Sequence, residues 1–187
     1  MYWYNKKNDI RKAAVAIAFA ALFVSCSTDP ATKREKTAKQ IDVPAFFKQE
    51  VERLQREKPI VLKTVTKDDL SEKKELQIEN WANELASFQT IDLNKPAYAD
   101  VLTKDSTANT LIYSSTGPEI DLSYVEIQFN KAHKPVNWII KRTIKNSLYQ
   151  TEEVLKYYSD SAYSIEKEQS VLILGDKRYG VEATFIK

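Results

Sequence analysis

The stretch Val125-Glu126-Ile127-Gln128-Phe129, the turn at residues 130–135 and the stretch Val136-Asn137-Trp138-Ile139-Ile140-Lys141 decide the fold of this chain. Apolar residues occupy at least every other position in both stretches, which is the period of a strand with one buried face. The turn is too short for a parallel crossover, which needs a dozen or more residues. The two stretches are therefore predicted to be antiparallel neighbours in a sheet.

Further short strands are predicted on both sides of this hairpin. Segments rich in β-branched and aromatic residues are separated by clusters of Asn, Asp, Ser and Pro, which form the turns in a chain with only three glycines. The predicted strands are residues 60–66, 75–79, 98–104, 110–115, 148–158, 163–169, 170–174 and 179–186.

Two helices are predicted before the main run of strands. Asp42 is suited to cap the first, Pro44 suits its first turn, and apolar residues recur at helical spacing from Phe47 to Leu54. Asn80 is suited to cap the second, whose apolar residues also fall on one side. The predicted fold class is α+β: a curved antiparallel β-meander of about seven or eight strands with two short helices, half-open or barrel-like.

The first 25 residues have the layout of a signal peptide. Residues 1–12 hold four basic side chains and one acid, and residues 13–24 form an unbroken apolar run. A membrane-spanning helix needs about 20 apolar residues, so twelve are too few to cross a bilayer. We expect residues 1–25 to be removed.

The end of this segment, Leu22-Phe23-Val24-Ser25-Cys26, resembles the lipobox of bacterial lipoproteins. The resemblance implies cleavage between Ser25 and Cys26 and attachment of diacylglycerol to the Cys26 sulfur. Two or three acyl chains make a durable membrane anchor. No cofactor is expected besides this covalent lipid. Because Cys26 is the only cysteine, an intramolecular disulfide is excluded.

Three parts are predicted: the signal peptide at 1–25, the acylated cysteine with a polar tether at 26–43, and one domain at 44–187. Loss of residues 1–25 changes the formal net charge from +2 to −1. The high sequence pI therefore belongs largely to the signal, and nucleic-acid binding, which needs a concentrated basic surface, is not expected.

The whole chain is similar to the small lipoproteins of unknown function in Bacteroidota, which combine a lipobox, a polar tether and a Tyr- and Lys-rich β domain. Ser27 follows the cysteine, at the position where an aspartate favours inner-membrane retention in the enterobacterial sorting pattern. The resemblance implies the periplasmic side of the outer membrane, with surface display as the second choice.

Catalytic and metal-binding patterns are missing from the sequence. His133 is the only histidine and lies in the predicted turn at 130–135, where it reads as an exposed turn residue. With Cys26 acylated, no zinc site of the usual kind can form. Asp68-Asp69 reads as a pair of solvated turn acids, and Glu152 and Glu153 must point to opposite faces of a strand. We therefore expect that the protein is not an enzyme and binds no metal.

Aromatic residues carry the remaining signal. Tyr149, Tyr157, Tyr158 and Tyr163 cluster in the late hairpin, and Tyr149 and Tyr157 share strand parity. Tyrosine has an apolar body and a polar tip, so the cluster is a candidate binding surface for a partner or a glycan. Ordinary cross-strand packing is the competing interpretation.

Three functions stay open on the sequence alone. The first is a non-catalytic binding module anchored in the membrane, with an envelope protein or lipid as its ligand. The second is a carrier of lipid or of a small hydrophobic molecule, similar to the lipoprotein-sorting proteins of the LolA/LolB type, which would need an apolar cavity. The third is an enzyme that uses carboxylates alone.

Overall fold

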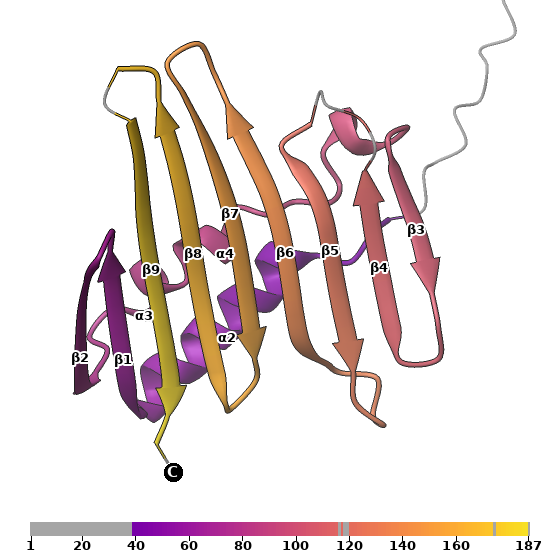
Figure 1. Ribbon diagram of the computed structural model, residues 1–187. Helices are drawn as coiled ribbons and strands as arrows, with labels where there is room; N and C mark the ends of the chain where they lie inside the picture. The colour runs from indigo at the N-terminus through magenta and orange to yellow at the C-terminus, as the bar shows by residue number, and fades with distance from the viewer. Residues whose placement is uncertain (1–38, 116, 118–119, 174, 187) are drawn as a thin grey trace, which may run out of the picture. The chain divides into compact units, whose positions relative to one another are not determined.

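The computed structural model describes residues 39–115, 117, 120–173 and 175–186. Within these residues, nine antiparallel strands form one open sheet, and short helices lie against it (Figure 1). This confirms the predicted α+β class and the curved antiparallel meander. The sheet does not close into a barrel, because β2 and β3 are its two edge strands.

The elements follow one another in a simple order. They are α2 (Val43–Glu57), β1 (Ile60–Lys67), β2 (Leu70–Gln77), α3 (Trp81–Glu84), α4 (Ala86–Gln89), η1 (Pro96–Tyr98), β3 (Leu102–Ser106), β4 (Thr110–Ser115), β5 (Leu122–Phe129), β6 (Pro135–Lys145), β7 (Tyr149–Tyr158), β8 (Ala162–Val171) and β9 (Gly175–Phe185).

Strands β3 to β9 form an uninterrupted meander, in which each strand pairs with the next. The β1–β2 hairpin joins the far end of this meander, because β1 pairs with β9 from Val61 opposite Phe185 to Lys67 opposite Tyr179. The chain between β2 and β3 carries α3, α4 and η1 across one face of the sheet to the opposite edge (Figure 1).

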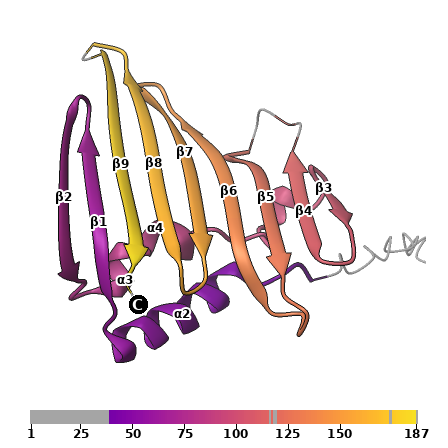
Figure 2. The same cartoon turned by 60° about the horizontal axis from the view of Figure 1, so that its bottom comes forward.

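Helix α2 crosses the same face of the sheet (Figure 2). It begins as the sequence predicts: the Asp42 carboxylate accepts a hydrogen bond from the Ala45 N–H at 3.0 Å, and Pro44 lies in the first turn. It ends at Glu57, and the next residue, Lys58, adopts a left-handed conformation. Its buried residues are Val43, Phe47 and Leu54.

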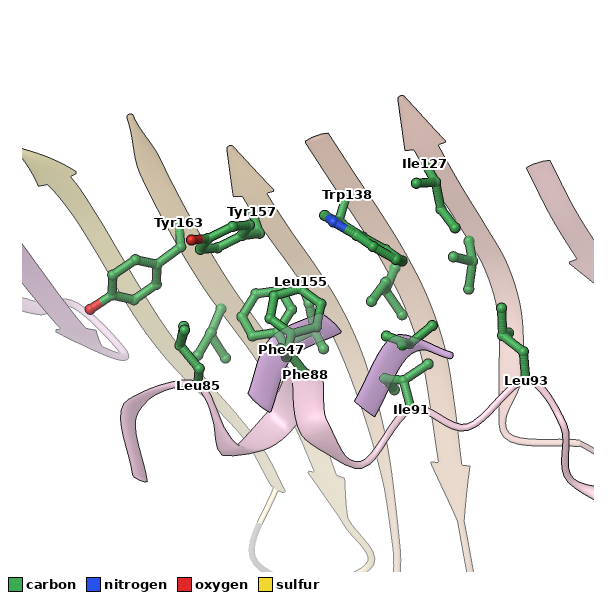
Figure 3. Packing of buried hydrophobic residues seen from close by; sticks show 14 of the residues in the cluster. Phe47, Leu85, Phe88, Ile91, Leu93, Ile127, Trp138, Leu155, Tyr157 and Tyr163 are labelled. Atoms are coloured by element: carbon green, nitrogen blue, oxygen red, sulfur yellow. The ribbon is translucent and has the colours of Figure 1, made fainter. Parts of the chain in front are cut away.

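Aromatic rings fill the space between the helices and the sheet (Figure 3). Phe47 of α2 stacks on Phe88 of α4, with 4.7 Å between ring centroids. Phe47 also lies 5.3 Å from Tyr157 of β7 and 5.4 Å from Trp138 of β6. All four side chains are completely buried. The two layers are therefore joined by a packed aromatic core.

The structure corrects four predicted elements. The predicted strand 75–79 overlaps only the end of the longer strand β2, which spans Leu70–Gln77. The predicted strand 98–104 divides into η1 and β3, since Pro96 starts a helical turn. Residues 170–173 of the predicted strand 170–174 are the end of β8 and part of the following turn, because Val171 pairs directly with Gly175. The second helix is two short pieces, α3 and α4, which meet at Leu85.

Candidate functional site

The four tyrosines of the candidate binding surface do not lie together on an exposed face. Tyr157 and Tyr163 are 0% and 1% exposed and face the helices. Tyr149 shares their side of the sheet but lies near its end and is 36% exposed, whereas Tyr158 points to the opposite face. The interpretation as one shared surface is thus corrected, because α2, α3 and α4 cover the face that the odd-numbered tyrosines share.

The two buried tyrosines connect the sheet to the helices by hydrogen bonds to carboxylates. The Tyr157 hydroxyl donates to Glu50 of α2, and the Tyr163 hydroxyl donates to Glu84 of α3 at 2.6 Å. Burial, together with these carboxylates, raises the pKa of both phenols well above the ordinary value. Lys63 of β1 completes the second group by an ion pair with Glu84 at 2.7 Å. These residues hold the two layers together.

The face of the sheet away from the helices carries a hollow of about 660 Å³ over β1, β7, β8 and β9. Gly180 lies at its centre, between Thr66 of β1 and Glu166 of β8 in the strand register. A Cβ atom at position 180 would lie 3.5 Å from the Thr66 Cβ. Because glycine has no side chain, the hollow is deeper at this position. Thr64 and Ser164 add hydroxyl groups to its lining.

Acidic side chains outnumber basic ones on this face of the hollow. Its carboxylates belong to Asp68, Glu152, Glu166, Glu168 and Glu182, whereas its cations belong to Lys156, Lys167 and Arg178. Lys156 pairs with Glu166 at 3.3 Å and Arg178 with Glu168 at 3.1 Å. In the part of the chain that the structure describes, Glu152 and Glu182 have no ion-pair partner. The lining thus has an excess of negative charge, which favours positively charged ligands.

Asp68 marks the end of the hollow, in the turn between β1 and β2. Its carboxylate accepts the Arg178 N–H at 3.0 Å and lies 3.6 Å from Lys177. The Arg178 N–H, followed by Lys177, lowers the pKa of the Asp68 carboxyl. Asp68 is therefore negatively charged, and its contacts connect the β1–β2 turn to β9.

A second group of charges lies on the helix-covered face. Glu153 is 3% exposed, accepts a hydrogen bond from Arg142, and pairs with Lys167 at 2.8 Å. Burial alone would raise the pKa of Glu153, but the hydrogen bonds from Lys167 and Arg142 lower it overall. Glu152 is exposed on the other face, as the strand parity predicts. Every oxygen of this buried acid is engaged by its own chain, so we assign it a structural role.

The remaining predicted site residues fall in two places. Ser25 and Cys26 lie outside the described residues. His133 is exposed in the β5–β6 turn with a positive φ of 54°, and its N–H donates to the Asn130 carbonyl at 2.9 Å. Within the described ranges, no group of three or more His, Cys, Asp and Glu side chains is arranged to hold a metal ion.

The sequence interpretation missed the hollow itself. Gly180 was the available signal, because a glycine inside a predicted strand marks a place where a side chain is excluded or another group approaches. Glu182 and Arg178 carried no signal of their own, since alternating charges are common on any solvated strand face.

Comparison with protein-family models, with characterised proteins and with solved structures found no match. Among the described residues, no helix has the length and apolar character needed to cross a membrane. The residues themselves define the class: an open antiparallel sheet with helices packed on one face and an acidic hollow on the other.

Proposed function

We propose that this chain is a lipid-anchored protein of the bacterial envelope whose folded part is a non-catalytic binding module. The basic start, the apolar run and the lipobox-like stretch ending at Cys26 support the anchor. Incorporation of radiolabelled palmitate at Cys26, and its loss in Cys26→Ser, tests this part.

We place the protein on the periplasmic side of the outer membrane, so protease added to intact cells is expected to spare it. Loss of the domain from intact cells would indicate surface display.

The acidic hollow is the observation that supports a binding role. Neighbouring strands lie about 4.8 Å apart, so the four strands beneath the hollow span about 14 Å, which is wide enough for an extended peptide. Glu152 and Glu182 are available to a ligand because no basic side chain of the described chain occupies them. We therefore propose that the ligand is a positively charged segment of an envelope protein, rich in lysine or arginine.

A lipid carrier is less well supported, because it needs an apolar cavity that the ligand can enter. The natural place for one is between the helices and the sheet. There the rings of Phe47, Phe88, Trp138 and Tyr157 pack against one another. The hollow on the other face is open to solvent and is lined by charged side chains together with apolar ones such as Val154 and Val181.

A fluorescent lysine hexamer is a direct probe of the hollow. We expect Glu152→Gln and Glu182→Gln each to weaken its binding by about two- to fivefold, because exposed ion pairs contribute less than about 1 kcal/mol. Gly180→Val should weaken it too, by filling the floor. Glu75→Gln is the matched control: it removes an acid from β2 on the same face, outside the hollow. An equal effect of Glu75→Gln would show that only overall charge matters and would refute the site.

A further inference from the structure

Two neighbouring turns at one end of the sheet expose large aliphatic side chains. Leu148 in the β6–β7 turn is 68% exposed, and Leu172 and Ile173 in the β8–β9 turn are 84% and 89% exposed. The Leu172 N–H donates to the Leu148 carbonyl at 3.2 Å, so the two turns lie side by side, as Figure 1 shows at the top of the sheet. We call these three residues the hairpin-tip cluster.

The turns at the opposite end of the sheet are different. Residues 107–109, 130–134 and 159–161 contain Thr, Asn, Lys, His, Ser and Asp, with alanine as the largest aliphatic residue. Polar residues are the ordinary choice for such turns, because they stabilise the turn and remain hydrated. Leu148, Leu172 and Ile173 contribute almost nothing to the core of the described domain. Grouped apolar exposure of this kind marks a contact surface.

We propose that the hairpin-tip cluster inserts into the surface of the membrane that holds the lipid anchor. The inference rests on the proposed acylation of Cys26. Lys39 lies thirteen residue steps after Cys26, and such a length spans at most about 43 to 47 Å. The longest strands have 11 residues and measure about 36 Å. Even with the tips against the bilayer, Lys39 lies within reach of the anchored cysteine.

A lipid surface fits the cluster better than a protein partner does. Three side chains on two projecting turns do not form the continuous patch of about 800 Å² that each partner of a stable protein interface buries. A bilayer needs no such patch, because its acyl chains adapt to projecting aliphatic groups. Lys145 and Asp176 flank the two turns, and Lys177 pairs with Asp68 at 3.6 Å, so these charges largely balance and neither strongly attract nor strongly repel anionic headgroups.

The acylated full-length protein can be labelled at a single introduced thiol to test this proposal. Because the Cys26 sulfur carries lipid, Ile173→Cys introduces the one free thiol, and Ala132→Cys does the same in the β5–β6 turn at the opposite end. Each thiol is labelled with a polarity-sensitive fluorophore, and the protein is reconstituted in vesicles of phosphatidylethanolamine and phosphatidylglycerol at a 3:1 ratio. We expect iodide quenching at position 173 to be at least threefold weaker than at 132, and brominated lipids to quench only the label at 173.

Equal iodide quenching at the two positions would overturn membrane insertion while leaving the anchor intact. Protection of position 173 in native envelopes but not in vesicles would also overturn it, in favour of a protein partner. Intact mass measures acylation separately, and an unacylated chain would overturn both the anchor and this inference. Leu172→Cys provides a second label site, and unchanged tryptophan emission of each variant verifies that it is folded.

Discussion

At the scale of single residues, we expect substitution of Glu153 to have a large effect on the free energy of unfolding. Its carboxylate is buried between Arg142 and Lys167. Removing the charge of Glu153 leaves the mostly buried Arg142 without its carboxylate partner, whereas the half-exposed Lys167 stays hydrated. We expect Glu153→Gln to lower the free energy of unfolding by about 3 kcal/mol. Urea unfolding measures this, and the exposed neighbour Glu152→Gln should stay within about 0.5 kcal/mol of the parent.

The same pair of proteins tests the direction of the pKa change. The pKa of Glu153 is lower in the folded state, so its charge adds stability above the unfolded pKa near 4.5. That contribution disappears as the pH falls through the folded value. The stability difference between the parent and Glu153→Gln should therefore shrink from pH 7 to pH 3. A constant difference across this range would show that packing, and not charge, explains the loss.

The sequence revealed the parity of these residues but not which face would be covered. Alternation placed Tyr149 and Tyr157 on one side and separated Glu152 from Glu153, and both relations are present in the structure. Both faces of β7 carry a mixture of polar and large residues. The choice between a packed and an exposed tyrosine depended on where distant helices would lie, which local spacing does not contain.

At the scale of elements, the start of α2 depends on one cap. The Asp42 carboxylate satisfies the Ala45 N–H, which has no partner within the helix. We expect Asp42→Ala to cost about 1 kcal/mol in thermal or urea unfolding, the usual value for loss of an N-cap. Glu52→Ala, at an exposed position in the middle of the same helix, should be neutral or slightly stabilising, since alanine favours helix. Equal losses from both substitutions would contradict a specific capping role.

The elements with strong local signals were predictable, and those set by distant pairing were not. The cap at Asp42, the strand 110–115 and the strands around the 130–135 turn follow from short patterns, and the structure contains them. Residues 170–174 were predicted as a separate strand, but Ser170 and Val171 are the end of β8. Leu172 and Ile173 lie in the turn that follows, which is set by the pairing of Val171 with Gly175, whose φ of 75° suits glycine. Two residues of the hairpin-tip cluster, Leu172 and Ile173, belong to this mispredicted segment. There the local pattern favours a strand, but the structure has a turn.

At the scale of the whole domain, β9 joins two parts of the chain that are far apart in sequence. It lies between β8, its neighbour along the chain, and β1, more than a hundred residues earlier. The predicted meander accounts for β3 to β9, but the return of β9 to β1 has no local signature. It follows from the helical segment between β2 and β3, which takes the chain across the sheet and leaves β1 open to pair with the last strand.

This arrangement predicts a gradient of hydrogen exchange across the sheet. Strands β7 and β8 are paired on both sides and pack on the aromatic core, so their amides should exchange only through global unfolding. Strand β2 is an edge strand whose residues are almost all exposed. Its amides should exchange at least a hundredfold faster through local opening, as measured residue by residue by NMR.

The comparison also tests whether the β2 edge stays free. Four charged residues at its centre, Glu72-Lys73-Lys74-Glu75, oppose edge-to-edge pairing between copies of the chain. Exchange in β2 should therefore be independent of protein concentration. Protection of β2 equal to that of β7 and rising with concentration would mean that β2 pairs with a second copy. In that case the charges would have failed to protect the edge, and the sheet would be continuous between two molecules.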